Sequence, residues 1–264
     1  MTENTQPGAT PTGITLQYEG PVATIVLDLA SSKNTFRASD VERLSSLLDE
    51  ALHEGARCLV VRGKGACFSA GWDLSSVNPE SENPQAMITD VIAPFCRLLR
   101  ELPVPTISAV AGPALGFGLG LALSCDLCLA DEDALLGSPF RNIGMVPDTG
   151  AHFFFLNRLG YPLAAELIYT GRLLSGREAA QVGLINRAVP SGTAASEAAS
   201  LAAHIASGPT QAFRLSKQIL LQGGDFDAVV GHEGRQLVKV FATEDLKEGI
   251  HAFQQRRKPI FKGR

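Results

Sequence analysis

The chain has 264 residues, of which 45% are hydrophobic and 19% charged, and its formal net charge at pH 7 is −4. This composition supports one large domain with a sizeable core, and the slightly acidic balance argues against a nucleic-acid partner because it leaves no broad basic surface. The sequence opens without an apolar leader and its five cysteines are an odd number, so we expect free thiols in a reducing, cytoplasmic setting.

The N-terminal part of the chain predicts a hairpin followed by a helix. Residues 1–12 are polar and rich in Pro, Gly and Thr, which predicts a disordered tail. Apolar residues then alternate and Glu19-Gly20-Pro21 predicts a turn, so we expect residues 14–28 to pair as two strands. Residues 39–54 predict an amphipathic helix that is capped by Ser39 and whose buried face consists of Val41, Leu44, Leu47, Leu48 and Leu52.

The middle of the chain alternates between strand and helix patterns. Residues 57–63 predict a buried strand, and residues 64–77 a loop that leads into a short helix. An amphipathic helix at 87–103 is followed by a strand at 106–112, then by a glycine-rich helix and a strand at 126–131. This alternation favours an α/β fold with parallel strand pairing.

The segment from Leu102 to Cys125 contains no charged residue, which raises the question of a membrane span. About 20 apolar residues cross a bilayer as a helix, so length alone permits one. However, the segment contains three prolines and four glycines, which destabilise a helix by about 3 and about 1 kcal/mol each. We therefore expect a buried strand, a turn and a short helix that ends near Cys125, and no membrane partner.

The C-terminal half is predicted to be mainly helical. Residues 148–160 predict a helix with Asp148 near its N-terminus, and four further helical patterns follow residue 193. We therefore expect a strand-containing core at 13–193 and a helical C-terminal region at 194–264.

No residues have the spacing of metal ligands. Cys125 and Cys128 form a single C-x-x-C pair with no second pair or nearby histidine, so we interpret them as core thiols. Of the five histidines, His152, four residues after Asp148, is the candidate that could face the same pocket.

Two loops have the small residues that expose main-chain amides. They are CFSAGWDL at 67–74 and GPALGFGLG at 112–120, and each follows a predicted strand and opens a helix. Amides at a helix start have no intrahelical acceptor, so two such loops side by side can direct two N–H groups at one oxygen. The second loop does not match a dinucleotide fingerprint, because Gly120 comes one position early. Close packing of helix and sheet is the alternative role of its glycines.

These two loops, with the block that continues through LSCDLCLADEDALLGSPFRNIGMVPDTG, resemble the enoyl-CoA hydratase/isomerase, or crotonase, superfamily. The first loop matches F-x-A-G-x-D-[LI], and the second matches N-G-x-A-x-G-x-G except that Ala111 replaces the Asn. The resemblance implies an α/β spiral of ββα turns that binds an acyl-CoA thioester. It also implies a helical C-terminal region that forms a homo-trimer or a hexamer, and no separate cofactor, since coenzyme A is part of the substrate.

The resemblance implies catalytic roles as well. The backbone amides of Trp72 and Phe117 would form an oxyanion hole, and the two glutamates of hydratases fall on Gly120 and Phe140. The carboxylate pair that activates water is therefore absent. Asp148 stands where ring-1,2-epoxyphenylacetyl-CoA isomerases, dienoyl-CoA isomerases and an aryl-CoA dehalogenase carry a catalytic Asp, and IGMVPDTG is most like the first of these. A helix N-cap is the structural alternative for Asp148.

Other residues are predicted by the same resemblance to bind substrate or coenzyme A. Lys33 matches a basic position that some family members use near the nucleotide, and Asn34 matches the family's loop asparagine. Lys258, Phe261 and Lys262 lie in the basic C-terminal end. Asp73 is among the predicted substrate-site residues, but we interpret its role as structural more than catalytic. The predicted acyl-CoA site is completed by Ala70, Gly71, Asp73, Leu74, Gly116 and Phe140.

We therefore expect an enzyme of fatty-acid metabolism that shifts a double bond of an enoyl-CoA, with Asp148 moving one proton between two carbons. Two alternatives stay open: a hydratase of β-oxidation that uses an unusual carboxylate, and an acyl-CoA carrier that has lost catalysis. Aromatic residues predict an apolar or aromatic acyl pocket, although core packing explains the Phe run equally well; they are Trp72, Phe117, Phe140 and Phe153 to Phe155.

Overall fold

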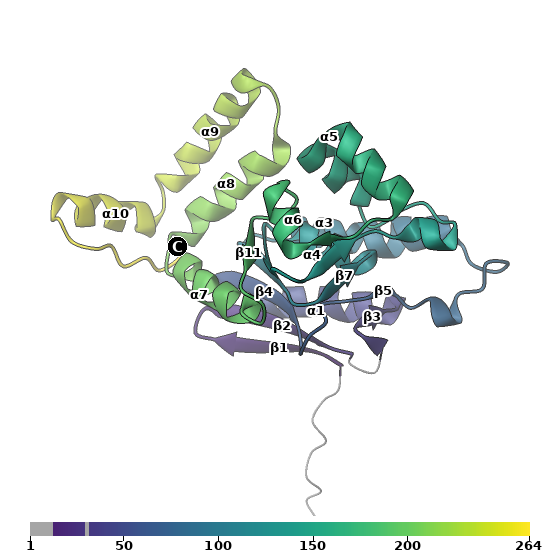
Figure 1. Cartoon of the computed structure of the whole chain (residues 1–264). Coiled ribbons are helices and arrows are strands. Elements are labelled where there is room, and N and C mark those ends of the chain that lie inside the picture. The colour runs from purple at the N-terminus through teal and green to yellow at the C-terminus, as the bar shows by residue number, and fades with distance from the viewer. Residues whose placement is uncertain (1–12, 30–31) are drawn as a thin grey trace, which may run out of the picture.

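The computed structural model describes residues 13–29 and 32–264, so the tail predicted at 1–12 lies outside the described residues. Its central feature is a six-stranded sheet in which an antiparallel hairpin is followed by parallel strands (Figure 1). The predicted hairpin and the parallel pairing are therefore confirmed. The strand order is β1 (Gly13–Glu19), β2 (Val22–Asp28), β4 (Cys58–Gly63), β6 (Thr106–Val110), β8 (Leu127–Asp131) and β11 (Arg187–Val189).

Short strands that follow the long ones form two smaller sheets. One joins β3 (Thr35–Phe36) to β5 (Gly71–Trp72), and the other has the order β10, β9, β7. Each inner parallel strand is thus followed by a short strand and then by helix: β4 by β5, β6 by β7 and β8 by β9. This repeated ββα unit confirms the expected crotonase-like spiral. The second small sheet comprises β7 (Pro113–Leu115), β9 (Leu135–Gly137) and β10 (Leu174–Ser175).

Helix α1 (Ala38–His53) covers one face of the sheet with the apolar stripe that its spacing predicts. The predicted cap is wrong: Arg37 is the N-cap, and its amide donates to Asp40 Oδ2 at 2.8 Å. Because the helix starts one residue earlier, Ser39 lies inside the first turn. The buried residues are Val41, Leu44, Leu47, Leu48 and Ala51, whereas Leu52 is half-buried.

The predicted helix at 87–103 consists of three consecutive helical pieces. These are α2 (Pro84–Ala86), the π-helical segment η3 (Met87–Ile92) and α3 (Ala93–Glu101). Pro94 follows directly on the π turn, in which the Ala93 amide bonds to Ile88 O, five residues earlier. Proline has no N–H to continue the α-helical hydrogen bonds, which accounts for the change from π-helix to α-helix at this point.

The uncharged segment contains the expected strand β6 and the expected short helix α4 (Phe117–Ser124), all eight residues of which are buried, but the short strand β7 lies where a turn was predicted. Within residues 13–29 and 32–264 no helix has the length and apolarity to cross a membrane. Cys125 and Cys128 are buried free thiols beside this helix, as predicted. Burial raises the pKa of Cys128 to about 11, so its thiol stays protonated.

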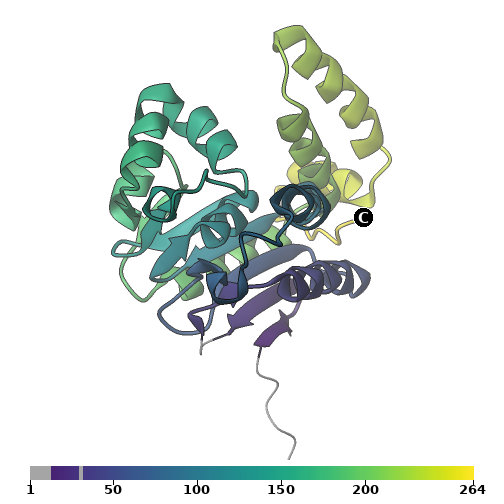
Figure 2. The ribbon, with the colours of Figure 1, turned by 90° about the vertical axis from the view of Figure 1, so that its right-hand side faces the viewer.

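The remaining helices follow β9 in the chain. Helix α7 packs its alanines, Ala194, Ala198, Ala202 and Ala206, against the main sheet. Figures 1 and 2 show α9 and α10 projecting away from that sheet. The elements β10, α6 and β11 had no predicted counterpart. The helices are α5 (Ala151–Thr170), α6 (Gly176–Gln181), α7 (Ala194–Ala206), α8 (Thr210–Gln222), α9 (Phe226–Val240) and α10 (Glu244–Gln254).

Candidate active site

The two loops that expose main chain lie side by side. Ser69 forms an isolated parallel bridge with Ala114, and the Leu115 amide donates to Ser69 O at 3.0 Å. Gly71 has a φ of +107°, and a Cβ there would come within 2.9 Å of Leu115 O and 3.8 Å of Phe117 N. Glycine at position 71 therefore lets β5 approach the start of α4 closely.

The backbone amides of Trp72 and Phe117 are not used by the neighbouring secondary structure. In β5 the Asp73 amide donates to Phe36 O at 2.9 Å, and successive amides of a strand point to opposite sides. The Trp72 N–H is thus directed away from β3. Phe117 is the first residue of α4, where an amide has no intrahelical acceptor. Both donors belong to segments that Gly71 brings together.

A cavity of about 220 Å³ opens between these loops and the segment after β9. It brings together six of the predicted substrate-site residues, namely Ala70, Gly71, Trp72, Leu74, Gly116 and Phe140. The Phe117 side chain is buried on the other side of the backbone, with its ring centroid 5.6 Å from that of Trp72 and 4.9 Å from that of Phe36. This aromatic packing fixes the start of α4.

The two positions that hydratases fill with glutamate have different occupants here. A Cβ at Gly120 would lie 2.2 Å from Thr149 Cγ2 and 2.5 Å from Thr149 O, so no side chain fits at position 120. Phe140 lines the 220 Å³ cavity, and its ring comes within 3.1 Å of a Cβ placed on Gly116. Neither position at which the resemblance places a hydratase glutamate therefore holds a carboxylate: position 120 makes a tight backbone contact and position 140 carries an aromatic ring.

Asp148 begins a tight turn that leads into α5. Thr149 has a φ of +53° and Gly150 of +77°, and the Ala151 amide donates to Asp148 O at 3.0 Å. These features define a type I′ turn, which is strained for a β-branched residue such as Thr149. Gly150 is the N-cap of α5 and the helix has no side-chain cap, so the alternative reading of Asp148 as an N-cap is wrong.

The Asp148 carboxylate is partly buried and accepts a hydrogen bond from Thr149 Oγ1 at 2.7 Å. Removal from water raises the pKa of Asp148, while the Thr149 hydroxyl opposes that rise by stabilising the charged form. A carboxylate with a raised pKa is a stronger base than an exposed one.

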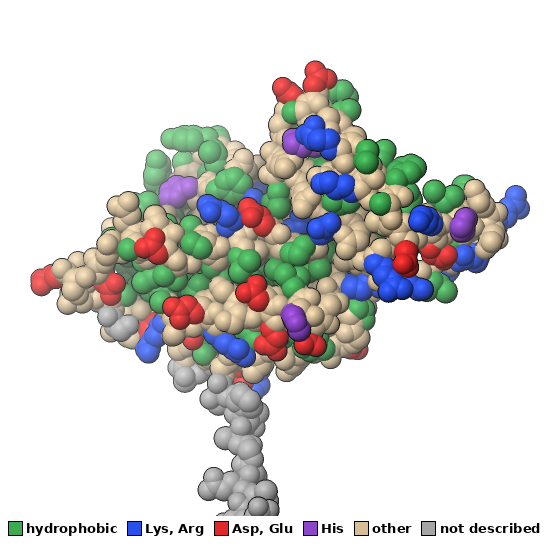
Figure 3. All heavy atoms as spheres, turned by 180° about the vertical axis from the view of Figure 1, so that it is seen from behind, with side chains coloured by type: hydrophobic (Ala, Val, Ile, Leu, Met, Phe, Trp, Pro, Cys, Tyr) green, Lys and Arg blue, Asp and Glu red, His purple; other side chains and the backbone are tan. Residues whose placement is uncertain are grey.

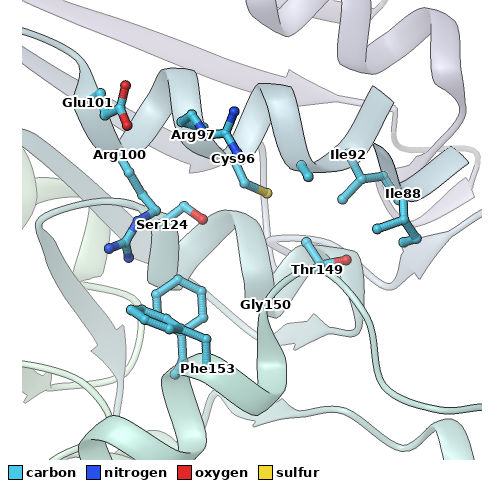
Figure 4. Close-up of a pocket in the computed structure, with 12 residues that line it drawn as sticks. Ile88, Ile92, Cys96, Arg97, Arg100, Glu101, Ser124, Thr149, Gly150 and Phe153 are labelled. Atoms are coloured by element: carbon cyan, nitrogen blue, oxygen red, sulfur yellow. The ribbon is translucent and has the colours of Figure 1, made fainter. Parts of the chain in front are cut away.

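A second cavity, of about 310 Å³, lies between α3 and the start of α5 (Figure 4). Cys96, Ser124, Thr149 and Gly150 are among the residues that line it. Burial raises the pKa of Cys96 to about 11, the Ser124 hydroxyl lowers it, and the charge of Asp148 raises it further. The Asp148 carboxylate thus lies close enough to Cys96 to affect it, although Asp148 is not among the described residues that line either cavity.

Asn34 and Asp73 serve to hold the loops. Asn34 is 2% exposed; its Oδ1 accepts from the Leu29 amide at 2.7 Å and its Nδ2 donates to Cys67 O at 2.9 Å. Asp73 accepts hydrogen bonds from the amide and hydroxyl of Ser75 and from Arg37, which lower its pKa to about 2. Lys33, in contrast, is exposed.

The structure does not bring the predicted C-terminal residues into either cavity of the same chain. Phe261 packs beside α10 and its carbonyl accepts from Arg57, while the Lys262 amide donates to Asp245 Oδ1 at 2.6 Å. Lys258 is exposed, as is His152 on the first turn of α5. In the part of the chain that the structure describes, no group of three His, Cys, Asp or Glu residues could hold a metal ion.

Sequence reasoning missed Thr149, Cys96 and Arg100. The left-handed backbone of Thr149 has no sequence signal, because threonine rarely adopts it. Cys96 and Arg100 sit one turn apart on α3, and only the tertiary packing places Cys96 near Asp148 and Arg100 against Phe153 and Phe154 of α5.

Comparisons with known proteins agree with this architecture. The sequence model of the enoyl-CoA hydratase/isomerase family matches residues 17–264. The structure superposes on that of an enoyl-CoA hydratase from Bacillus anthracis with a TM-score of 0.89 and 31% identity, covering 96% of this chain and all of the other. An enoyl-CoA isomerase/hydratase of Mycosarcoma maydis is 34% identical over 211 residues, 79% of this chain and 77% of that protein.

The fold and the paired loops define a crotonase-type enzyme, a class that acts on acyl-CoA thioesters. This chain belongs to the enoyl-CoA hydratase/isomerase family.

Proposed function

We propose that this chain is an enoyl-CoA isomerase, which moves a double bond from the β,γ to the α,β position of an acyl-CoA. The contact between Gly120 and Thr149 carries the proposal, because it leaves no room for the first glutamate that water addition would use. Phe140 stands at the second glutamate position. Asp148, with its raised pKa, is then the carboxylate available as a base.

In the proposed reaction the Trp72 and Phe117 amides hold the thioester oxygen. Asp148 takes a proton from the α-carbon of a β,γ-enoyl thioester, and the C–H electron pair delocalises onto that oxygen as a dienolate. Asp148 then returns the proton to the γ-carbon, the α,β double bond forms and the carbonyl is restored. One carboxyl group suffices, and no water is consumed. The reacting carbons would lie between the two cavities, beside the Asp148–Gly150 turn.

Turnover of matched substrates tests the proposal. We expect the purified protein to convert 3-hexenoyl-CoA to its conjugated 2-enoyl isomer and to add no water to crotonyl-CoA. Asp148→Asn should abolish the isomerisation while binding of hexanoyl-CoA, measured by calorimetry, is retained. An Asp148→Asn protein that still isomerises would refute the role of Asp148, and hydration of crotonyl-CoA would favour the hydratase alternative. Binding without any turnover would favour an acyl-CoA carrier.

We propose in addition that the C-terminal helices pack against further copies of the chain, as a trimer or hexamer. The large apolar side chains of this region are exposed in the single chain, including Leu220 (82%), Phe226 (80%) and Phe253 (85%), and Figure 3 shows hydrophobic groups on these helices. Exposed apolar patches of this kind are typical of protein interfaces. Light scattering of the purified protein should give three or six times the chain mass, and a monomer would contradict the assembly.

A further inference from the structure

The 310 Å³ cavity contains an arginine with no acid partner. Arg100 of α3 has its guanidinium 4.8 Å from the ring centroid of Phe153 and 5.5 Å from that of Phe154. Figure 4 shows its side chain reaching from α3 toward Ser124 and Phe153. Among residues 13–29 and 32–264, no carboxylate forms a salt bridge with Arg100. Stacking on aromatic faces leaves the in-plane N–H donors of a guanidinium free for an anion.

A buried hydroxyl beside Arg100 also lacks a partner. Ser124, the last residue of α4, is 2% exposed and lines the same cavity. Its Oγ forms no hydrogen bond of normal geometry within the described chain, although it lies near enough to the Cys96 thiol to lower the pKa of that thiol. A buried polar atom without a partner is costly and calls for an explanation, and a ligand atom in the cavity is one.

These groups lie in line with the proposed oxyanion-hole donor. Phe117, Gly120 and Ser124 occupy positions i, i+3 and i+7 of α4, which share one face of a helix. Phe117 carries the donor amide, Gly120 contacts the turn that holds Asp148, and Ser124 borders the cavity of Arg100. Seven residues of helix span about 10 Å. Carbon–carbon bonds of about 1.5 Å allow an extended acyl chain of roughly six to eight carbons to cover that distance. Because Thr149 fills the face of α4 at Gly120, the chain would run beside that contact and not through it.

We propose that Arg100 and Ser124 bind a carboxylate at the far end of the acyl chain, so that the preferred substrates are thioesters of dicarboxylic acids. This inference rests on the proposed function only for the position of the thioester. Ile88 and Ile92 line the same cavity and would contact the methylene groups, while Arg100 and Ser124 would contact the terminal oxygens. Glu101 and Arg97 also line the cavity, and both are exposed to solvent.

Binding of unreactive, saturated thioesters tests the inference independently of turnover. Adipyl-CoA and hexanoyl-CoA, and likewise suberyl-CoA and octanoyl-CoA, have equal chain lengths and differ in the terminal carboxylate. We expect the carboxylate-bearing member of at least one pair to bind the wild-type protein roughly 10- to 100-fold more tightly by calorimetry, the range for a charged hydrogen bond. Equal affinity within both pairs would overturn the inference.

Substitutions of the residues that line the cavity then test whether they cause the preference for the dicarboxylic thioester. Arg100→Gln should remove most of the preference for the dicarboxylic member while leaving the affinity for hexanoyl-CoA within about threefold. Ser124→Ala should remove a smaller part. Arg43→Gln removes the same charge from an exposed position of α1, outside the cavity, and should keep the preference. Equal losses in Arg43→Gln and Arg100→Gln would show a general charge effect and refute the site.

The two proposals fail in distinguishable ways. If wild-type protein prefers adipyl-CoA but isomerises neither 3-hexenoyl-CoA nor its carboxylate-ended counterpart, the anion site stands and the isomerase proposal fails. If 3-hexenoyl-CoA is isomerised and neither pair shows a preference, the isomerase proposal stands and the anion site fails.

Discussion

The side chain of Thr149 occupies the space that any side chain at Gly120 would need. A Cβ at position 120 would come within 2.2 Å of Thr149 Cγ2, and Thr149 is itself 5% exposed and held with a positive φ. The same residue donates its hydroxyl to Asp148. One strained residue thus excludes a second carboxylate and orients the first, which is the kind of feature that clusters at functional sites.

The contact at Gly120 predicts a steric penalty. Gly120→Ala should lower the free energy of unfolding by about 1–3 kcal/mol, because the rigid backbone oxygen of Thr149 blocks the new methyl group. Gly234→Ala is the matched control in α9, since a Cβ there has nothing within 4 Å; it should stabilise by roughly 1 kcal/mol. Urea unfolding measures both values. Equal effects at the two positions would contradict the tight contact.

The hydroxyl of Thr149 should set the pH at which the base works. Its hydrogen bond stabilises the ionised carboxylate, so Thr149→Val should raise the pKa of Asp148 and move the rising limb of kcat/KM to higher pH. Thr149→Ser keeps the hydroxyl and should keep the wild-type profile. The assay is the pH dependence of 3-hexenoyl-CoA isomerisation. Superimposable profiles for the Val variant and wild type would rule out this role.

Two aspartates should have opposite effects on stability at pH 7. Burial raises the pKa of Asp148 above its unfolded value, so its ionised form destabilises the fold at neutral pH, and this cost disappears as the pH falls below the unfolded pKa. Asp148→Asn should therefore raise Tm at pH 7, with a smaller gain at acid pH.

Asp73 has its pKa lowered to about 2 by Ser75 and Arg37, so it stabilises the fold above its unfolded pKa and loses that contribution as the pH falls toward 2. Asp73→Asn should therefore lower Tm at pH 7. Melting curves at pH 7 and at acid pH give the signs for both variants, and a lower Tm for Asp148→Asn at pH 7 would be inconsistent with a carboxylate that is costly to ionise.

The close approach at Gly71 should be necessary for turnover. Gly71→Ala would place a Cβ 2.9 Å from Leu115 O and separate the Trp72 and Phe117 amides, with an expected loss of about 10²- to 10³-fold in kcat. Gly65→Ala has a similarly positive φ of +78° but nothing within 4 Å, so it should cost stability and leave kcat unchanged. If Gly71→Ala isomerises at the wild-type rate, the two amides do not act together.

Much of the fold was predictable because helices and strands that bury one face show a regular spacing of apolar residues in the sequence. The hairpin, α1 and the four C-terminal helices follow from apolar spacing, and β6 and α4 follow from an uncharged segment with prolines and glycines that exclude a long helix. The strands β10 and β11 were missed because two or three residues are too few to show a period. The α1 cap was missed because the backbone of Arg37, and not its side-chain type, begins the helix.

The amino-acid sequence was enough to predict an α/β fold and two small-residue loops, since hydrophobic period and motif spacing are local properties of a chain, and the resemblance of those loops to a known family implied the ββα spiral. The surroundings of Asp148 became visible only in the folded chain. Two contacts form these surroundings: Thr149 packs against Gly120, and Arg100 stacks on Phe153. Each contact joins segments that are about 30 to 50 residues apart in the sequence. Such contacts depend on how α3, α4 and α5 pack together, and no local pattern records that packing.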